Sequence, residues 1–298
     1  MKRRNLPLIF CAVVALLSAL PIAAQSNSFT QTNPTWVKPF PAFRIAGNLY
    51  YVGSEDLAAY LIVTPQGNIL INSNLASSPP QIKKAIESLG FKFNDTKILL
   101  ISHGHFDHCA GSAEIKRETG AKYEVMEQDV PVVESGGHTD FHYGADKSMW
   151  FPPTKVDHVL HDGDTVSLGG TTLTAHLTAG HTKGTTTWTL DETEGGRTLH
   201  VVIVGSPNVN PGYKLVGNQT YPQIASDYRH EFEVLKKLTC DVFLGEHGGY
   251  FDLLAKYDRF KNGDKNAFID PEGYKAYVAD RQQAFEKALH RQSSAAHK

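Results

Sequence analysis

The stretch ISHGHFDH, at residues 101–108, places four metal-binding side chains within six residues, directly after a hydrophobic run that predicts a buried strand. Two histidines separated by one residue point the same way from an extended chain, so His103 and His105 can bind one metal ion. Asp107 and His108 follow where the chain turns toward a helix, so their side chains can reach a second ion. The alternative, a solvated polar loop or a hydrogen-bonded core cluster, is disfavoured by four such residues at this spacing. The stretch therefore predicts a two-zinc site, which suggests hydrolysis.

Two later histidines occupy similar settings. His181 lies in the glycine-flanked turn TAGHTKG at residues 178–184, and His247 lies in GEHGG at residues 245–249 after an apolar run. Glycine lets the backbone approach a metal closely, so both histidines are candidate ligands. The remaining histidines lack such a setting and are expected to be structural or solvated.

The first 24 residues have the pattern of a cleaved signal peptide. Three basic residues precede an apolar run at residues 6–22, and small residues end at Ala24. We therefore expect residues 25–298 to be periplasmic or secreted, and no later stretch is apolar enough to span a bilayer. Loss of the three basic residues changes the net charge from −2 to about −5, so nucleic acid is not an expected partner.

The length of residues 25–298 fits one large domain, or two fused halves around a shared pair of sheets, and the chain is expected to be a monomer. Strands and helices alternate in it without a strict βαβ period. Strands are predicted at Leu49–Val52, Ala58–Val63, Asn68–Ile71, Lys97–Ser102, Lys122–Met126, Val156–Leu160, Thr165–Leu168, Thr171–Leu177, Thr185–Leu190, Leu199–Val204 and Asp241–Leu244. Helices are predicted at Gln81–Leu89, Ser112–Thr119, Gln128–Glu134, Tyr221–Leu238 and Pro271–Arg291, with a polar-aromatic loop at 136–153 and a frayed tail at Ser293–Lys298. This order favours two mixed β-sheets packed together with helices outside.

Two cysteines, Cys109 and Cys240, remain after loss of the signal segment. A disulfide between them is possible in an exported protein. Cys109 adjoins a candidate ligand in a turn that should pack tightly under the metal site, so two buried free thiols are the preferred interpretation.

The chain resembles the metallo-β-lactamase superfamily, whose α/β fold is an αββα sandwich. The resemblance lies in the order of three features: the first motif, then Gly180-His181, then a late histidine after an apolar strand. The resemblance covers essentially all of residues 25–298. Gly205-Ser206, at the position that most hydrolases of the superfamily fill with a metal-bridging aspartate, is similar to the third subclass of zinc β-lactamases (class B, subclass three). The segments at 36–40, 53–57 and 208–215 resemble that subclass too. Asn72 departs from the aspartate common in the superfamily, which puts support near the metals in doubt.

The resemblance implies two zinc ions per chain and a shared hydroxide that attacks the β-lactam amide of penicillins, cephalosporins and carbapenems. It implies substrate contacts from Ser206 and Asn208, and a hydrogen bond from Tyr213 to the developing oxyanion. Trp150 and Phe151, or Trp36 and Phe40, are candidates for an apolar wall. The implied ligands are His103, His105 and His181 for the first ion and Asp107, His108 and His247 for the second.

Two other functions remain open. One is a dizinc hydrolase of another ester or thioester, against which the missing bridging aspartate and the export signal count. The other is a zinc-binding module without catalytic activity, which six ligands with open coordination positions disfavour.

Overall fold

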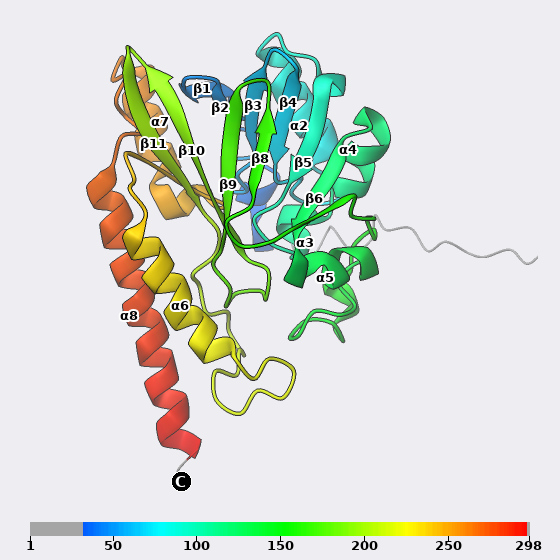
Figure 1. Cartoon of the computed structure of the whole chain (residues 1–298), viewed down its shortest axis with the longest axis vertical. Helices are drawn as coiled ribbons and strands as arrows, with labels where there is room; N and C mark the ends of the chain where they lie inside the picture. The colour runs from blue at the N-terminus through cyan, green and yellow to red at the C-terminus, as the bar shows by residue number, and fades with distance from the viewer. Residues whose placement is uncertain (1–31, 297–298) are drawn as a thin grey trace, which may run out of the picture.

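The computed structural model describes residues 32–296, which form two β-sheets packed face to face with helices on the outer faces (Figure 1). One sheet has seven strands in the order β1 to β7, and the other has five in the order β12-β11-β10-β9-β8. The predicted αββα sandwich is confirmed. The predicted signal segment, residues 1–24, lies outside the described residues.

The seven-stranded sheet is antiparallel from β1 to β4 and parallel from β4 to β7. Its strands are β1 (Phe43–Ala46), β2 (Leu49–Tyr51), β3 (Tyr60–Thr64), β4 (Gly67–Ile71), β5 (Thr96–Leu100), β6 (Lys122–Met126) and β7 (His158–Leu160). The sequence did not predict β1, an edge strand of four residues in which the exposed Arg44 lies among buried apolar residues.

The five-stranded sheet is antiparallel except for the pairing of β11 with β12. Its strands are β8 (Thr165–Leu168), β9 (Thr171–Leu177), β10 (Thr186–Glu194), β11 (Arg197–Val204) and β12 (Val242–Gly245). The hairpin of β10 and β11 is longer than predicted, since residues 191–194 pair with residues 197–200. The sequence did not predict this extension because residues 191–194 are polar and lack the alternation of a strand. Gly195 and Gly196 close this hairpin with φ angles of 61° and 79°.

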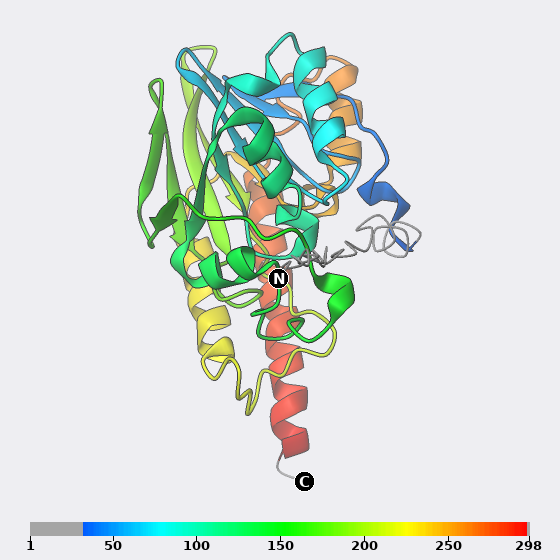
Figure 2. The same cartoon turned by 90° about the vertical axis from the view of Figure 1, so that its right-hand side faces the viewer.

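The helices are α2 (Pro79–Ser88), α3 (Phe106–Cys109), α4 (Ser112–Thr119), α5 (Val130–Ser135), α6 (Ile224–Lys237), α7 (Leu253–Lys261) and α8 (Pro271–Ala296). Short 3₁₀ turns occur at Pro34–Trp36, Phe93–Asp95, Glu127–Asp129, Lys147–Met149 and Gly248–Phe251. The sequence did not predict α3 or α7. The frayed tail predicted from Ser293 is wrong as far as Ala296, since α8 continues to that residue and extends beyond the sheets (Figure 2). None of the helices in residues 32–296 is both long and apolar enough to cross a membrane.

Strand alternation divides the core into layers. Ile69 and Ile71 of β4 face the cluster shared with the second sheet, whereas Leu70 faces the cluster that also contains Ile82 of α2 and Ile115 of α4. Both cysteines are buried and free, as predicted.

Two contacts join the sheets directly beneath the first histidine motif. The indole nitrogen of the buried Trp188, on β10, donates to the carbonyl of Ile101 at 3.0 Å. The backbone nitrogen of Thr186 donates to the carbonyl of Ser102 at 2.7 Å. These bonds fix the chain after β5 against the start of β10, and therefore position His103 relative to the turn that precedes β10.

Candidate metal centre

The predicted metal ligands meet where several strands end. His103 and His105 follow β5, and Asp107 and His108 lie in α3. His181 lies between β9 and β10, and the last histidine follows β12. Residues almost 150 positions apart in the sequence thus meet at one edge of the sandwich.

The first predicted ligand set forms a compact group. One ligand atom from each of His103, His105 and His181 lies within 4.8 Å of the others. Nδ1 of His105 and Nε2 of His181 are 3.1 Å apart. His181 donates through Nδ1 to the carbonyl of Asn208 at 2.9 Å, which leaves Nε2 facing the group. This ring orientation suits metal binding through Nε2.

The second predicted set also converges. Oδ2 of Asp107 lies 3.4 Å from Nε2 of His108 and 3.8 Å from Nε2 of His247. Burial alone would raise the pKa of Asp107, but His108 and His247 hold it well below its usual value. His108 is fully buried, and its ring centroid lies 4.9 Å from that of His247. The two sets meet at His103, which also groups with Asp107 and His108.

The donor atoms fit bound zinc. Nε2 of His103 and both ring nitrogens of His108 are buried and lack a hydrogen-bond partner among residues 32–296. Unpaired polar atoms are costly in a protein interior unless another group binds them. Burial lowers the pKa of His103 to about 4 and that of His181 well below its usual value, so both rings are neutral near pH 7, as ligands must be.

Two carboxylates contact ligand rings on their outer sides. Oδ2 of Asp56 lies 3.0 Å from Nδ1 of His247, and also accepts from the indole of Trp36. Oδ2 of Asp140 lies 3.5 Å from Nε2 of His105. Burial alone would raise the pKa of Asp140, but His105 and two backbone donors lower it to about 2. Such partners orient the rings of metal-bound histidines.

We expect Asp56→Ala to weaken zinc binding by about 10- to 100-fold, because His247 loses the partner that holds its ring. The matched control is Glu55→Ala, since the neighbouring Glu55 pairs with Lys38 at 2.6 Å instead. Competition with a chromogenic chelator measures both affinities. Equal affinity of the two variants would show that Asp56 has no such role.

Asn72 supports the first motif despite its departure from the superfamily. It is fully buried with a φ angle of 67°, a backbone conformation that asparagine tolerates better than most residues. Its side-chain oxygen accepts from the backbone nitrogen and the hydroxyl of Ser102, at 2.8 and 3.0 Å. The amide of Asn72 therefore supports the metal-binding motif by accepting hydrogen bonds from Ser102, the residue before His103.

Asp129 joins the two histidine loops. It is buried, and its Oδ2 accepts from the backbone nitrogen of Gly104 and the hydroxyl of Thr182, both at 2.7 Å. Its Oδ1 accepts from the backbone nitrogen of Gly184 at 2.9 Å. A Cβ atom at residue 184 would lie 2.6 Å from Asp129, so only glycine allows this approach. The carboxylate therefore ties the loop of His105 to the loop of His181.

A cavity of about 590 Å³ lies over the metal-binding groups. Its apolar wall includes Trp36, Phe151 and Met149. Phe40 instead packs against the core, and the ring of Trp150 contacts that of His138. No lysine or arginine lines the cavity among the described residues. A substrate anion must therefore be bound by metal ions or by neutral donors.

The predicted substrate-binding residues lie differently from one another. Asn208 lines the cavity, and its amide donates to the hydroxyl of Tyr250 and accepts from Arg281 at 2.9 Å. Ser206 is fully buried, with its hydroxyl 3.2 Å from that of Tyr250. Tyr250, which the sequence did not single out, therefore stands between Ser206 and the cavity.

The role predicted for Tyr213 is not supported by its placement. Tyr213 is only 3% exposed, does not line the cavity, and donates its hydroxyl proton to the carbonyl of His181 at 2.8 Å. This hydrogen bond uses the proton that an oxyanion would need. The structure thus gives Tyr213 the role of holding the His181 turn.

Tyr213→Phe is therefore expected to lower the free energy of unfolding by about 1 kcal/mol, the contribution of one hydrogen bond, while kcat changes by less than about tenfold. Urea unfolding and steady-state kinetics measure the two effects. A loss of kcat of about 10²- to 10³-fold with unchanged stability would instead restore the oxyanion role.

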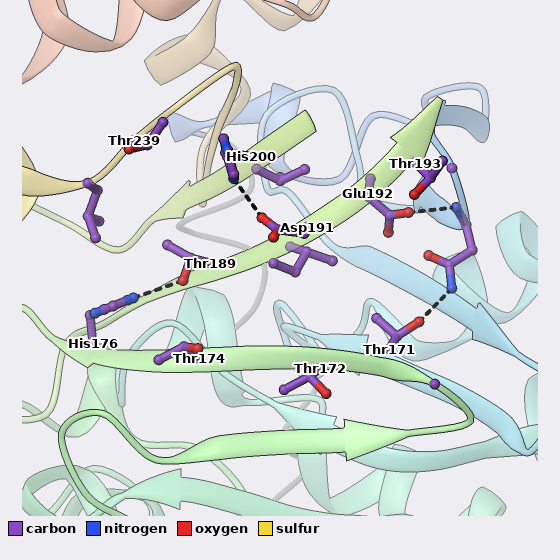
Figure 3. Close-up of a pocket in the computed structure, with 16 residues that line it drawn as sticks. Thr171, Thr172, Thr174, His176, Thr189, Asp191, Glu192, Thr193, His200 and Thr239 are labelled. Atoms are coloured by element: carbon purple, nitrogen blue, oxygen red, sulfur yellow. Dashed lines mark hydrogen bonds and ion pairs between the residues drawn. The ribbon is translucent and has the colours of Figure 1, made fainter. Parts of the chain in front are cut away.

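A larger cavity of about 840 Å³ lies along β9, β10 and β11 (Figure 3). Its lining is rich in threonine, and its histidines have polar partners: His176 contacts Thr189, and His200 contacts Asp191. None of the metal-binding groups found among residues 32–296 lies in it. The candidate chemistry therefore belongs to the smaller cavity.

Several residues of the centre escaped prediction because they are not themselves in a ligand motif. Asp56 lies in a segment already noted for its resemblance, Asp140 lies in the long loop, and Glu246 directly precedes a ligand. The last of these was open to detection, since a carboxylate beside His247 at a strand end is itself a possible ligand.

Comparison with known proteins places these features in a family. The family model of the metallo-beta-lactamase superfamily matches residues 57–247. The native FEZ-1 metallo-beta-lactamase from Legionella gormanii is 58% identical, with 86% of this chain and 98% of that chain covered and a TM-score of 0.85. The class B3 di-zinc metallo-beta-lactamase LRA-12 from an Alaskan soil metagenome is 41% identical, with 86% and 97% covered and a TM-score of 0.82.

Curated relatives match over a shorter region. A metal-dependent hydrolase of Rubrobacter xylanophilus is 40% identical over 65 residues, which are 22% of this chain and 25% of the relative. The chain thus spans about a quarter of the length of such relatives. The match to the family model, by contrast, includes every predicted metal ligand. The chain therefore belongs to the metallo-β-lactamase superfamily.

Proposed function

We propose that this protein is an exported β-lactamase that binds two zinc ions and hydrolyses the amide of penicillins, cephalosporins and carbapenems. The observation that carries the proposal is the convergence of two three-residue ligand sets beneath one cavity. The similarity to FEZ-1 over almost all of that enzyme supports it.

The proposal assigns a role to each part of the site. Zinc bound by the two ligand sets would supply a Lewis acid and lower the pKa of bound water toward neutrality. The amide of Asn208 holds the substrate carboxylate, because no cationic side chain of the described residues lines the cavity. Trp36 and Phe151 contact the apolar substituent of the lactam. Asp56 and Asp140 keep the ligand rings in place.

The test is hydrolysis of a carbapenem by the purified protein. The loss of lactam absorbance measures this hydrolysis before the metal is chelated, after chelation and after zinc is restored. We expect turnover that disappears with the metal and returns with it. A protein that binds two zinc ions yet leaves penicillins, cephalosporins and carbapenems intact would contradict the proposal. Thioester and lactone substrates would then be tested as the alternative.

Export and oligomeric state form a separate part of the proposal. Cleavage after Ala24 would give a periplasmic or secreted chain that begins at Gln25, which mass spectrometry of the protein recovered from the periplasm or medium would detect. We expect that chain to be a monomer in gel filtration. A cytoplasmic chain that retains residues 1–24 would contradict the export.

A further inference from the structure

Glu246 is a buried carboxylate that lies against both ligand sets. It directly follows β12, is fully buried, and helps to line the cavity. Its Oε2 lies 2.7 Å from Nδ1 of His103, and its Oε1 lies 3.9 Å from Nε2 of His108. One ligand atom from each of Glu246, His108 and His247 lies within 4.8 Å of the others. This carboxylate is therefore as close to two predicted ligands as the members of the first ligand set are to one another.

The negative charge of Glu246 is faced by histidines and by no lysine or arginine among the described residues. Its Oε2 lies 2.7 Å from Nδ1 of His103, and its Oε1 lies 3.5 Å from the hydroxyl of Tyr250. Histidines that bind metal are neutral, so they cannot balance this charge while they act as ligands. A buried carboxylate that faces only neutral groups is costly, and a bound cation removes that cost.

We infer that Glu246 is a seventh metal ligand, whose carboxylate lies between the two ligand sets. Oε2 faces His103, which belongs to the first set, and Oε1 faces His108, which belongs to the second. Ser206 follows the neighbouring strand β11, and its buried hydroxyl is separated from Glu246 by the hydroxyl of Tyr250, which lies 3.2 Å from the first and 3.5 Å from Oε1 of the second. The inference rests on the two-metal site of the proposed function, and it is independent of the substrate.

The inferred ligand changes the charge balance of the centre. Asp107 and Glu246 together place two negative charges beside two divalent ions, where the six predicted ligands alone place one. The ions are then held more tightly and withdraw less electron density from other ligands. The variant that lacks this carboxylate should therefore differ in both metal affinity and coordination.

Titration of metal-free protein with Co²⁺ and Zn²⁺ tests the inference without any substrate. Glu246→Gln keeps the size of the side chain and removes its charge. Glu192→Gln is the matched control, because Glu192 is another buried glutamate, lies in the other cavity and bonds the backbone nitrogen of Asn48 at 3.1 Å. Circular dichroism establishes that each variant is folded before titration.

We expect the parent and Glu192→Gln to bind two ions per chain with the same affinities. Glu246→Gln should bind one of the ions more than about 100-fold more weakly, beyond the range for a partner that only orients a ligand. Its visible Co²⁺ bands should also change in intensity, because the coordination number falls. Two ions bound with the affinity and spectrum of the parent would overturn the inference and leave Glu246 as an orienting partner of His103.

The outcomes also separate this inference from the proposed function. A parent protein that hydrolyses no β-lactam but loses metal affinity in Glu246→Gln would contradict only the proposed substrate. An active lactamase whose metal binding is unaffected by Glu246→Gln would contradict only the seventh ligand.

Discussion

His181→Ala is expected to lower kcat/KM for carbapenem hydrolysis by about 10³-fold or more, and to leave less than two zinc ions bound per chain. His181 supplies Nε2 to the group with His103 and His105, and no other side chain of the described residues replaces it there. A bound metal stabilises charge in the transition state by several kcal/mol, and about 4 kcal/mol corresponds to a factor of roughly 10³ in rate. Zinc analysis and steady-state kinetics on the same preparation measure both losses.

The control for this variant is His176→Ala. His176 lies on β9 only five residues before His181, but it contacts Thr189 at 2.8 Å and lines the other cavity. It should keep two zinc ions and the kcat/KM of the parent. Equal activity of the two variants would show that the histidine turn between β9 and β10 does not bind a catalytic metal, whatever the affinity of the other ligands.

The ligands were predictable because local sequence carries most of their signal. His103 and His105 are separated only by Gly104 and follow an apolar strand. Neither a solvated loop nor an ordinary core strand requires histidines at that spacing. The sequence signal for metal binding was weaker at His181 and His247, because each is a single histidine. They became candidates because glycines flank them at strand ends. The sandwich was predictable for a similar reason, since β-branched and apolar runs marked most strands of both sheets.

The failures occurred where tertiary contacts decide the outcome. The end of β10 is polar and forms a strand only because β11 pairs with it across the Gly195-Gly196 turn. The aromatic ring of Tyr213 gives no sign in the sequence that its hydroxyl bonds the carbonyl of His181. Asp140 contacts His105 through a loop of no regular structure, so no spacing rule predicts the pair.

Asp129→Asn is expected to lower the free energy of unfolding of the metal-free protein by about 2–4 kcal/mol. Each contact of Asp129 comes from a donor: the backbone nitrogens of Gly104 and Gly184 and the hydroxyl of Thr182. An asparagine amide can accept on one side only, and its NH₂ group would face an N–H group on the other. The buried donor that loses its acceptor costs about 1–3 kcal/mol, and the remaining bonds lose the strength that a charged acceptor gives them.

Urea unfolding of the metal-free protein isolates this effect, because bound zinc would add its own stabilisation. Asp146→Asn is the control, since Asp146 is exposed and accepts from the backbone nitrogen of Ser148 at 2.9 Å within one short turn. Because Asp129 joins the loops of His105 and His181, its loss should also weaken zinc binding, whereas the loss of Asp146 should not. Full stability with weakened zinc binding would mean that Asp129 aligns the loops without stabilising the fold. Unchanged stability and unchanged affinity would mean that the loops hold their positions through the contacts of Trp188 and Thr186 beneath them.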